Sequence, residues 1–273
     1  MSFASIKATD EEFAKFKEFI ETKIGIKFPE GKKSLLESRL ATHINKLGFK
    51  SFGEYFEYVG TLPELSDEID YLVDKITTHT TSFFRENHHF EFLLSKGIDI
   101  ILNQFGKTTI KVISLGSSTG EEMYSIAMVL ESQKKAGKIA GYVIDAADVS
   151  KYALLKAKEG IFKIDHLPSI PQQYKSFFDI KDNKIMAKPI LKNNLRFFII
   201  NICKKEQKFP DYYHIVFCRN TLIYFSKPLQ QNVIDNIKRI LLTGGLYFMG
   251  HSESLHGLEH DFKRIEPTIY QNV

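Results

Sequence analysis

The pattern of apolar residues changes character near residue 80, and this change constrains the fold more than any other sequence feature. From about residue 107 onward, short apolar runs alternate with segments of helical period. The predicted strands are 110–115, 142–146, 195–200, 214–218, 245–250 and 268–270, and the predicted helices are 121–130, 152–158 and 228–242. Such alternation predicts an α/β fold, with a mostly parallel sheet covered by helices on both faces.

The residues before this point predict helices alone. Thr9 and Glu12 fit a capping box, in which a hydroxyl and a carboxylate satisfy free backbone N–H groups at a helix start. Apolar residues recur at helical spacing in four segments, and Ser51 is placed to cap the third. We therefore expect a small helical bundle over 1–76, followed by a second domain over 77–273.

A stretch from about 160 to 197 interrupts the strand–helix rhythm. It contains three prolines and the dipeptide Asp182-Asn183, which suits a tight turn. We expect a small β-hairpin insertion that turns at this dipeptide.

Composition excludes several classes of function. The chain has 273 residues, 43% hydrophobic and 26% charged, as in an ordinary folded protein. No apolar run approaches the ~18–20 residues of a membrane span, and the N-terminus is unlike a signal peptide, so we expect a cytoplasmic protein. The formal charge of +4 is too small to indicate nucleic acid. Cys203 and Cys218 form no metal pattern and are expected to be reduced thiols.

The segment 115–122, Leu-Gly-Ser-Ser-Thr-Gly-Glu-Glu, joins the first predicted strand to its helix. A glycine turn before a helix lets the backbone approach a ligand, but the segment matches neither a Walker loop nor the dinucleotide fingerprint. Glu121 and Glu122 would repel phosphates and favour a cationic ligand, such as an amino or sulfonium group. Ordinary helix capping explains the same residues.

Asp148 follows the second predicted strand. Ligands in open α/β sheets sit beyond the carboxyl ends of strands, and an acidic residue here often accepts hydrogen bonds from ribose hydroxyls. Asp148 could also cap the next helix, although Ser150 could do so instead. Together with the glycine turn, Asp148 indicates a nucleoside ligand.

Two further segments carry candidate site residues. In 217–225, Asn220 could recognise a polar edge and Tyr224 could direct its hydroxyl into the cleft, unless Tyr224 and its apolar neighbours belong to the core. In 77–86, Arg85 follows two phenylalanines and offers planar, bidentate donation to a carboxylate.

Histidines occur at two places near these segments. His88 and His89 resemble metal ligands, but adjacent residues on a helix point apart and no carboxylate or cysteine completes a set. We interpret them as structural and expect no metal. His251 and Glu253 follow a late strand, where they could face the cleft or fix a turn.

In this order and spacing, the segments resemble the CheR-type chemoreceptor glutamate methyltransferases, which use S-adenosylmethionine. The resemblance covers nearly the whole chain and rests on 83–86 (Phe-Phe-Arg-Glu), 118–122, 217–225 and 250–253 (Gly-His-Ser-Glu). It implies a Rossmann-like class I methyltransferase sheet, with S-adenosylhomocysteine as product. The implied substrates are glutamate side chains in the cytoplasmic helical region of chemoreceptors, methylated for chemotactic adaptation.

The resemblance also implies site residues. The expected donor contacts are His79, Thr81, Arg85, Glu122, Asp148, Asn201, Ile202, Asn220 and Thr221. Arg85 and Tyr224 are expected to flank the methyl-transfer site, with Arg85 positioning the acceptor carboxylate. His79 stands where the family usually has Asn.

Partner recognition is expected from two regions. Arg39, His43 and Lys46 share one face of the second predicted helix, and the resemblance implies that acidic receptor helices dock there; a merely solvated helix side is the alternative. Some family members hold a receptor's C-terminal pentapeptide on the insertion. Here 178–197 is short and lacks glycine, so we expect tether-independent recognition by a monomer.

Two other functions stay open. The chain could methylate another carboxylate acceptor. Alternatively, it could be a chemosensory module that binds S-adenosylmethionine or S-adenosylhomocysteine without catalysis. His79 keeps this interpretation open, and the intact Arg85, Glu122, Asp148 and Tyr224 argue against it.

Overall fold

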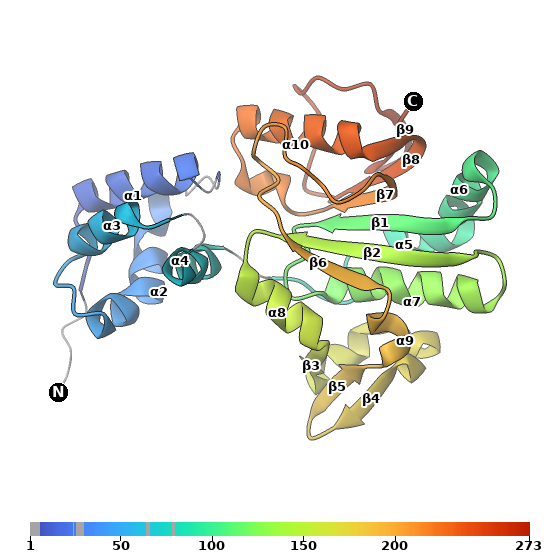
Figure 1. Cartoon of the computed structure of the whole chain (residues 1–273), viewed down its shortest axis with the longest axis horizontal. Helices are drawn as coiled ribbons and strands as arrows, with labels where there is room; N and C mark the ends of the chain where they lie inside the picture. Colours follow the sequence, from blue (N-terminus) through green and yellow to red (C-terminus); the bar gives the residue numbers. More distant parts are fainter. Residues whose placement is uncertain (1–5, 24, 26–29, 64–65, 78–79) are drawn as a thin grey trace. The chain divides into compact units, whose positions relative to one another are not determined.

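The computed structural model describes residues 6–23, 25, 30–63, 66–77 and 80–273 (Figure 1). The chain divides into two compact units. One comprises Met1–Thr78 with Ser150–Tyr152 and Tyr224–Ser226, and the other comprises His79–Val149, Ala153–Ile223 and Lys227–Val273. Within the described ranges, no helix is both long and apolar enough to cross a membrane.

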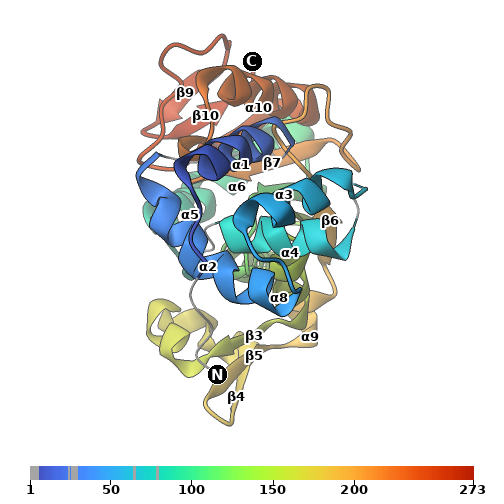
Figure 2. The ribbon, with the colours of Figure 1, turned by 90° about the vertical axis from the view of Figure 1, so that its left-hand side faces the viewer.

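The first unit is a bundle of α-helices, drawn in two views in Figures 1 and 2. The helices are α1 (Asp10–Lys23), α2 (Lys33–Lys46), α3 (Phe52–Thr61) and α4 (Asp67–Ile76). The capping box is confirmed, because the Thr9 amide donates to Glu12 Oε2 at 2.7 Å and the Glu12 amide donates to Thr9 Oγ1 at 3.1 Å. Ser51 likewise caps α3 by accepting from the Glu54 amide. The predicted all-helical region is confirmed.

The second unit contains a seven-stranded sheet of order β6-β2-β1-β7-β8-β10-β9. Its strands are β1 (Thr109–Leu115), β2 (Gly141–Asp148), β6 (Leu195–Ile199), β7 (Tyr213–Cys218), β8 (Leu241–Met249), β9 (Lys263–Glu266) and β10 (Ile269–Gln271). The first five in the sheet order are parallel, and β10 and β9 are antiparallel to their neighbours. The predicted mostly parallel sheet is confirmed, and β9 is a strand that the sequence pattern did not indicate.

The helices of this unit differ from the prediction mainly before β1. Here α5 (His88–Phe92), a π-helical stretch (Leu93–Gly97) and α6 (Ile98–Phe105) precede the sheet. The later helices are α7 (Glu121–Lys135), α8 (Lys151–Glu159), α9 (Pro189–Lys192) and α10 (Lys227–Ile240). The last of these ends earlier than predicted, because β8 already begins at Leu241, which pairs with Tyr213.

The insertion is a three-stranded antiparallel sheet of order β3-β5-β4. The predicted hairpin is formed by β4 (Phe178–Lys181) and β5 (Lys184–Ala187), and it turns at Asp182 and Asn183. Both turn residues have positive φ, at 51° and 55°, as a two-residue turn of the primed type requires. A third strand, β3 (Ile161–Lys163), pairs with β5. It was missed because three residues carry too little pattern.

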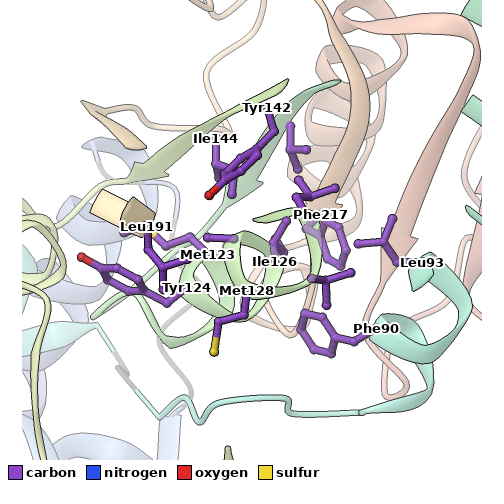
Figure 3. Close-up of a cluster of buried hydrophobic side chains, with 14 of the residues drawn as sticks. Phe90, Leu93, Met123, Tyr124, Ile126, Met128, Tyr142, Ile144, Leu191 and Phe217 are labelled. Atoms are coloured by element: carbon purple, nitrogen blue, oxygen red, sulfur yellow. The ribbon is translucent and has the colours of Figure 1, made fainter. Parts of the chain in front are cut away.

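Buried apolar side chains from α5, α7 and the central strands fill one continuous core (Figure 3). Phe217 of β7 stacks on Phe248 of β8 with ring centroids 4.3 Å apart. Both rings are fully buried, as is Ile144 on β2. The core therefore fixes the carboxyl ends of these strands, where the predicted site residues lie.

Candidate functional site

The sheet reverses its order at β1, which lies between β2 and β7. In parallel α/β sheets, such a reversal opens a crevice outside the carboxyl ends of the strands, and ligands bind there. The glycine turn after β1, Asp148 at the end of β2 and the segment after β7 all occupy this edge. These three segments therefore lie at the position where this fold binds ligands.

The glycine turn is tied to both neighbouring strands. The Gly116 amide donates to the Ala147 carbonyl at 2.8 Å, and the Ser118 amide donates to Asp148 Oδ2 at 2.8 Å. Gly116 has φ +75°, and a Cβ there would lie 2.6 Å from Thr221 Oγ1. The turn thus needs glycine for its backbone shape and for the close approach of Thr221.

Two hydroxyl groups of this turn have no hydrogen-bond partner within the described part of the chain. Ser117 Oγ and Ser118 Oγ are both buried. Buried polar groups are nearly always satisfied, so unpaired hydroxyls beside Asp148 indicate a place for a polar ligand. The arrangement fits the nucleoside part of the predicted methyl donor.

Arg219, which follows β7, is the buried cation of the site. Its side chain is 1% exposed and forms ion pairs with Glu86 at 3.1 Å and with Glu122 at 3.2 Å. It also donates to the Arg85 carbonyl. Arg219 lies in the segment 217–225 but had no predicted role. Its position directly after a buried strand was a local signal for it.

Glu122, at the start of α7, uses both carboxylate oxygens within the site. Oε1 accepts from Ser114 Oγ at 2.7 Å and Oε2 accepts from Arg219. Burial raises the pKa of Glu122 above its usual value, although Arg219 opposes the shift. The neighbouring Glu121 is held by the Thr119 hydroxyl at 2.7 Å.

Glu86 joins Arg219 to the two loops that follow β7 and β8. It accepts from Asn220 Nδ2 at 3.1 Å and from the His251 amide at 3.3 Å. Burial acts to raise the pKa of Glu86, but the bond from Asn220 and the charge of Arg219 outweigh it, so the pKa lies below its usual value. Glu86 is therefore held as a carboxylate.

Glu253 fixes a turn rather than facing the cleft. Its Oε1 accepts from the amides of Thr221 and Leu222, and its Oε2 accepts from those of Asn220 and Gly250, all at 2.6–2.8 Å. Burial raises the pKa of this carboxyl group, and the four N–H groups oppose the shift. Asn220 has φ +54°, so this carboxylate holds a strained backbone turn.

The remaining predicted residues are less closely connected. Arg85 is exposed and donates to the Thr80 carbonyl at 3.0 Å, while the two phenylalanines before it are buried. Asn201 accepts from the Cys203 amide at 3.0 Å. Thr81 is half-buried and Ile202 is buried. Tyr224 ends a short helical turn (Leu222–Tyr224) and is itself grouped with the helical unit. His79 lies outside the described residues.

Two of the three predicted docking residues have partners inside the helical unit. Arg39 donates to the carbonyls of Lys75 and Thr77, at 2.9 and 3.1 Å, and so caps the end of α4. His43 contacts Glu68 Oε1 at 2.8 Å and stacks on a neighbouring tyrosine. Lys46 is exposed. These contacts give Arg39 and His43 structural roles that the spacing of basic residues did not indicate.

Comparison with known proteins finds matches along nearly the whole chain. Residues 11–77 match the family described as the CheR methyltransferase all-alpha domain, and residues 79–271 match the CheR methyltransferase SAM binding domain. A chemotaxis protein methyltransferase of Borreliella burgdorferi is 33% identical, and the alignment covers 98% of this chain and 96% of that protein. One from Escherichia coli is 31% identical, with 96% and 91% covered.

The turn held by Glu253 provides a test of the site's construction. Glutamine in place of Glu253 has one carbonyl oxygen, so two buried N–H groups would face an amide NH₂ group. Each unpaired buried donor costs ~1–3 kcal/mol, so we expect Glu253→Gln to lower the free energy of unfolding by ~2–6 kcal/mol. Urea denaturation followed by circular dichroism measures this. Glu259→Gln, at an exposed position, is the matched control, and equal stability of the two variants would contradict the assignment.

Proposed function

The chain belongs to the CheR family of chemotaxis protein methyltransferases, and we propose that it transfers the methyl group of S-adenosylmethionine to glutamate side chains of chemoreceptors. The products are glutamyl methyl esters, which serve chemotactic adaptation, and S-adenosylhomocysteine. The observation that carries this proposal is the junction of the glycine turn with Asp148, where the Ser118 amide meets the carboxylate beside two unpaired buried hydroxyls.

We infer that the donor is held by the strand-end residues of the α/β unit. Asp148 would accept hydrogen bonds from the ribose hydroxyls, and the buried serines of the glycine turn would face the same nucleoside. The segment 79–85, the start of α7 and the segments after β6 and β7 would supply the remaining contacts. The expected residues are His79, Thr81, Arg85, Glu122, Asn201, Ile202, Asn220 and Thr221. S-adenosylmethionine supplies an electrophilic methyl group on a positively charged sulfur.

The acceptor needs no general base, because a glutamate side chain with a reference pKa of ~4.3 is ionised at neutral pH. One carboxylate oxygen forms a bond to the methyl carbon as the carbon–sulfur bond breaks, and the electron pair of that bond stays on sulfur. An anion and a cation become two neutral groups. Strong stabilisation of either charge would therefore favour the reactants, so orientation and partial removal of water are the useful contributions.

Arg85 is proposed to orient the acceptor carboxylate, with the Tyr224 hydroxyl as a neutral guide. Among the described residues, the exposed guanidinium of Arg85 donates one hydrogen bond, to the Thr80 carbonyl, which leaves further N–H donors for a carboxylate. Its backbone is held by Arg219, which bonds the Arg85 carbonyl.

We expect Arg85→Ala to lower the rate of methyl transfer by at least ~100-fold, because misplacement of a reacting group by about 1 Å has an effect of this size. The assay measures transfer of a radiolabelled methyl group to receptors of the same organism. Base hydrolyses the glutamyl methyl esters and releases the label for counting. Since Arg85 is exposed, the melting temperature should be unchanged. Arg264→Ala, also exposed, is the control. Normal turnover of the Arg85 variant would refute its role, and absence of transfer by the unaltered chain would refute the proposed function.

Asp148→Asn tests donor binding separately from transfer. A hydrogen bond to a charged acceptor contributes ~1.5–3 kcal/mol, so we expect the affinity for S-adenosylhomocysteine to fall by roughly 10–100-fold. Calorimetry measures this, with the exposed Asp165→Asn as control. If both variants bind as the unaltered chain does, Asp148 does not hold the ribose.

Receptor recognition is proposed to be independent of a pentapeptide tether and to occur in the cytoplasm, by a monomer. The support is the compact insertion, in which β4 and β5 are joined directly by Asp182 and Asn183. We expect no heat of binding when synthetic pentapeptides copied from receptor C-termini are titrated into the chain. Micromolar affinity for any of them would overturn tether independence and leave the methyltransferase assignment intact.

A further inference from the structure

Three histidine side chains from two distant segments meet beside the loop that follows β8. One ring nitrogen from each of His88, His89 and His251 lies within 4.8 Å of the others. The closest approach is between His251 Nε2 and the two ring nitrogens of His88, at 2.9 and 3.1 Å. At this separation one ring N–H can donate to a nitrogen of the other ring, or both rings can direct lone pairs at one cation.

The expectation that His88 and His89 point apart does not hold. Their ring centroids lie 3.9 Å apart, and both rings lie near that of His251. Because α5 begins at His88, its first turn presents both rings to the same loop. The sequence could not indicate this third member, which lies 163 positions away from His88.

The hydrogen bonds of His89 define which nitrogen carries its proton. The Thr268 hydroxyl donates to the Pro267 carbonyl at 2.6 Å, so its oxygen accepts from His89 Nε2–H at 2.8 Å. In the neutral ring, Nδ1 therefore holds a lone pair. His89 is fully buried, and Nδ1 has no hydrogen-bond partner within the described residues. Metal-binding histidines commonly have their second nitrogen fixed in this way.

The charge around the cluster is mixed. Glu86 Oε2 lies 3.6 Å from His89 Nδ1, too far for a hydrogen bond, so a lone pair faces a carboxylate. A cation between or beside them would relieve this repulsion. Arg219 opposes a cation, but its charge is already met by Glu86 and Glu122.

The geometry points to a binding site for one divalent transition-metal ion, formed by His88, His89 and His251. Imidazole nitrogens suit Zn²⁺, Ni²⁺ and Cu²⁺ rather than Mg²⁺ or Ca²⁺. Three histidines fill three positions of a tetrahedral Zn²⁺ site and leave the fourth to water. None of the three is among the residues proposed to hold the methyl donor. The ion would connect α5 to the loop after β8.

The test is calorimetric titration of Zn²⁺ into the full-length chain, freed of any affinity tag and stripped of metal with a chelator. We expect one ion per chain. His251→Ala removes a ligand at an exposed position, so the chain should fold normally and bind Zn²⁺ at least ~10-fold more weakly. Thr268→Ala, which removes the acceptor of His89 Nε2–H, should weaken binding by ~10–100-fold. Zn²⁺ should also raise the melting temperature of the unaltered chain but not that of His251→Ala.

His256→Ala is the matched control, because this exposed histidine lies in the same loop but outside the cluster. Its affinity for Zn²⁺ should equal that of the unaltered chain. No heat of binding with the unaltered chain, or equal affinity in His251→Ala, would overturn the site. Either result would leave the proposed methyltransferase function unaffected, since that function is tested with the methyl donor and receptors.

Discussion

A buried guanidinium is the constraint on which the candidate site depends. Arg219 lies at the end of β7, and its charge is met by Glu86 and Glu122, which are 133 and 97 positions earlier in the chain. A charge removed from water is tolerated when it is paired and hydrogen-bonded, whereas loss of one partner leaves an uncompensated buried charge. The turn at Glu86, the start of α7 and the end of β7 must therefore assemble together.

This pairing also suits the chemistry proposed for the site. Methyl transfer from a sulfonium to a carboxylate destroys one charge of each sign, so an intense fixed field at the reacting atoms would slow the step. The charges of Glu86 and Glu122 are compensated by Arg219, and Glu122 also accepts a hydrogen bond from the Ser114 hydroxyl. The site therefore offers fixed geometry and directed hydrogen bonds rather than a strong net electric field. An acceptor that is already ionised needs orientation, and this geometry can supply it.

Features that depend on nearby residues were predictable from the sequence. The strand–helix alternation, the capping box and the hairpin at Asp182 are all of this kind. The meeting of the glycine turn with Asp148, 30 positions away, was predictable for a different reason, because the carboxyl ends of parallel strands share one edge of the sheet. The role of Arg219 was missed, because its carboxylate partners are 97 and 133 positions away and a single sequence does not say which polar residues meet. For Glu253 the sequence left two roles open, and the structure shows that it fixes a turn. The strand β9 and the helices before β1 were missed because they are short.

In the helical unit, the sequence likewise did not indicate which residues the basic side chains of α2 contact. Basic residues at helical spacing on α2 predict a positive face, but the last carbonyls of α4 need donors, and Arg39 supplies them. His43 is likewise engaged with Glu68. Arg39 keeps its positive charge but directs N–H donors to backbone carbonyls, whereas Lys46 is exposed and lies beside Leu47, which is 45% exposed. An acidic receptor helix that docked on α2 would therefore meet Lys46 and an apolar contact at the surface, with Arg39 contributing its charge but fewer free N–H donors.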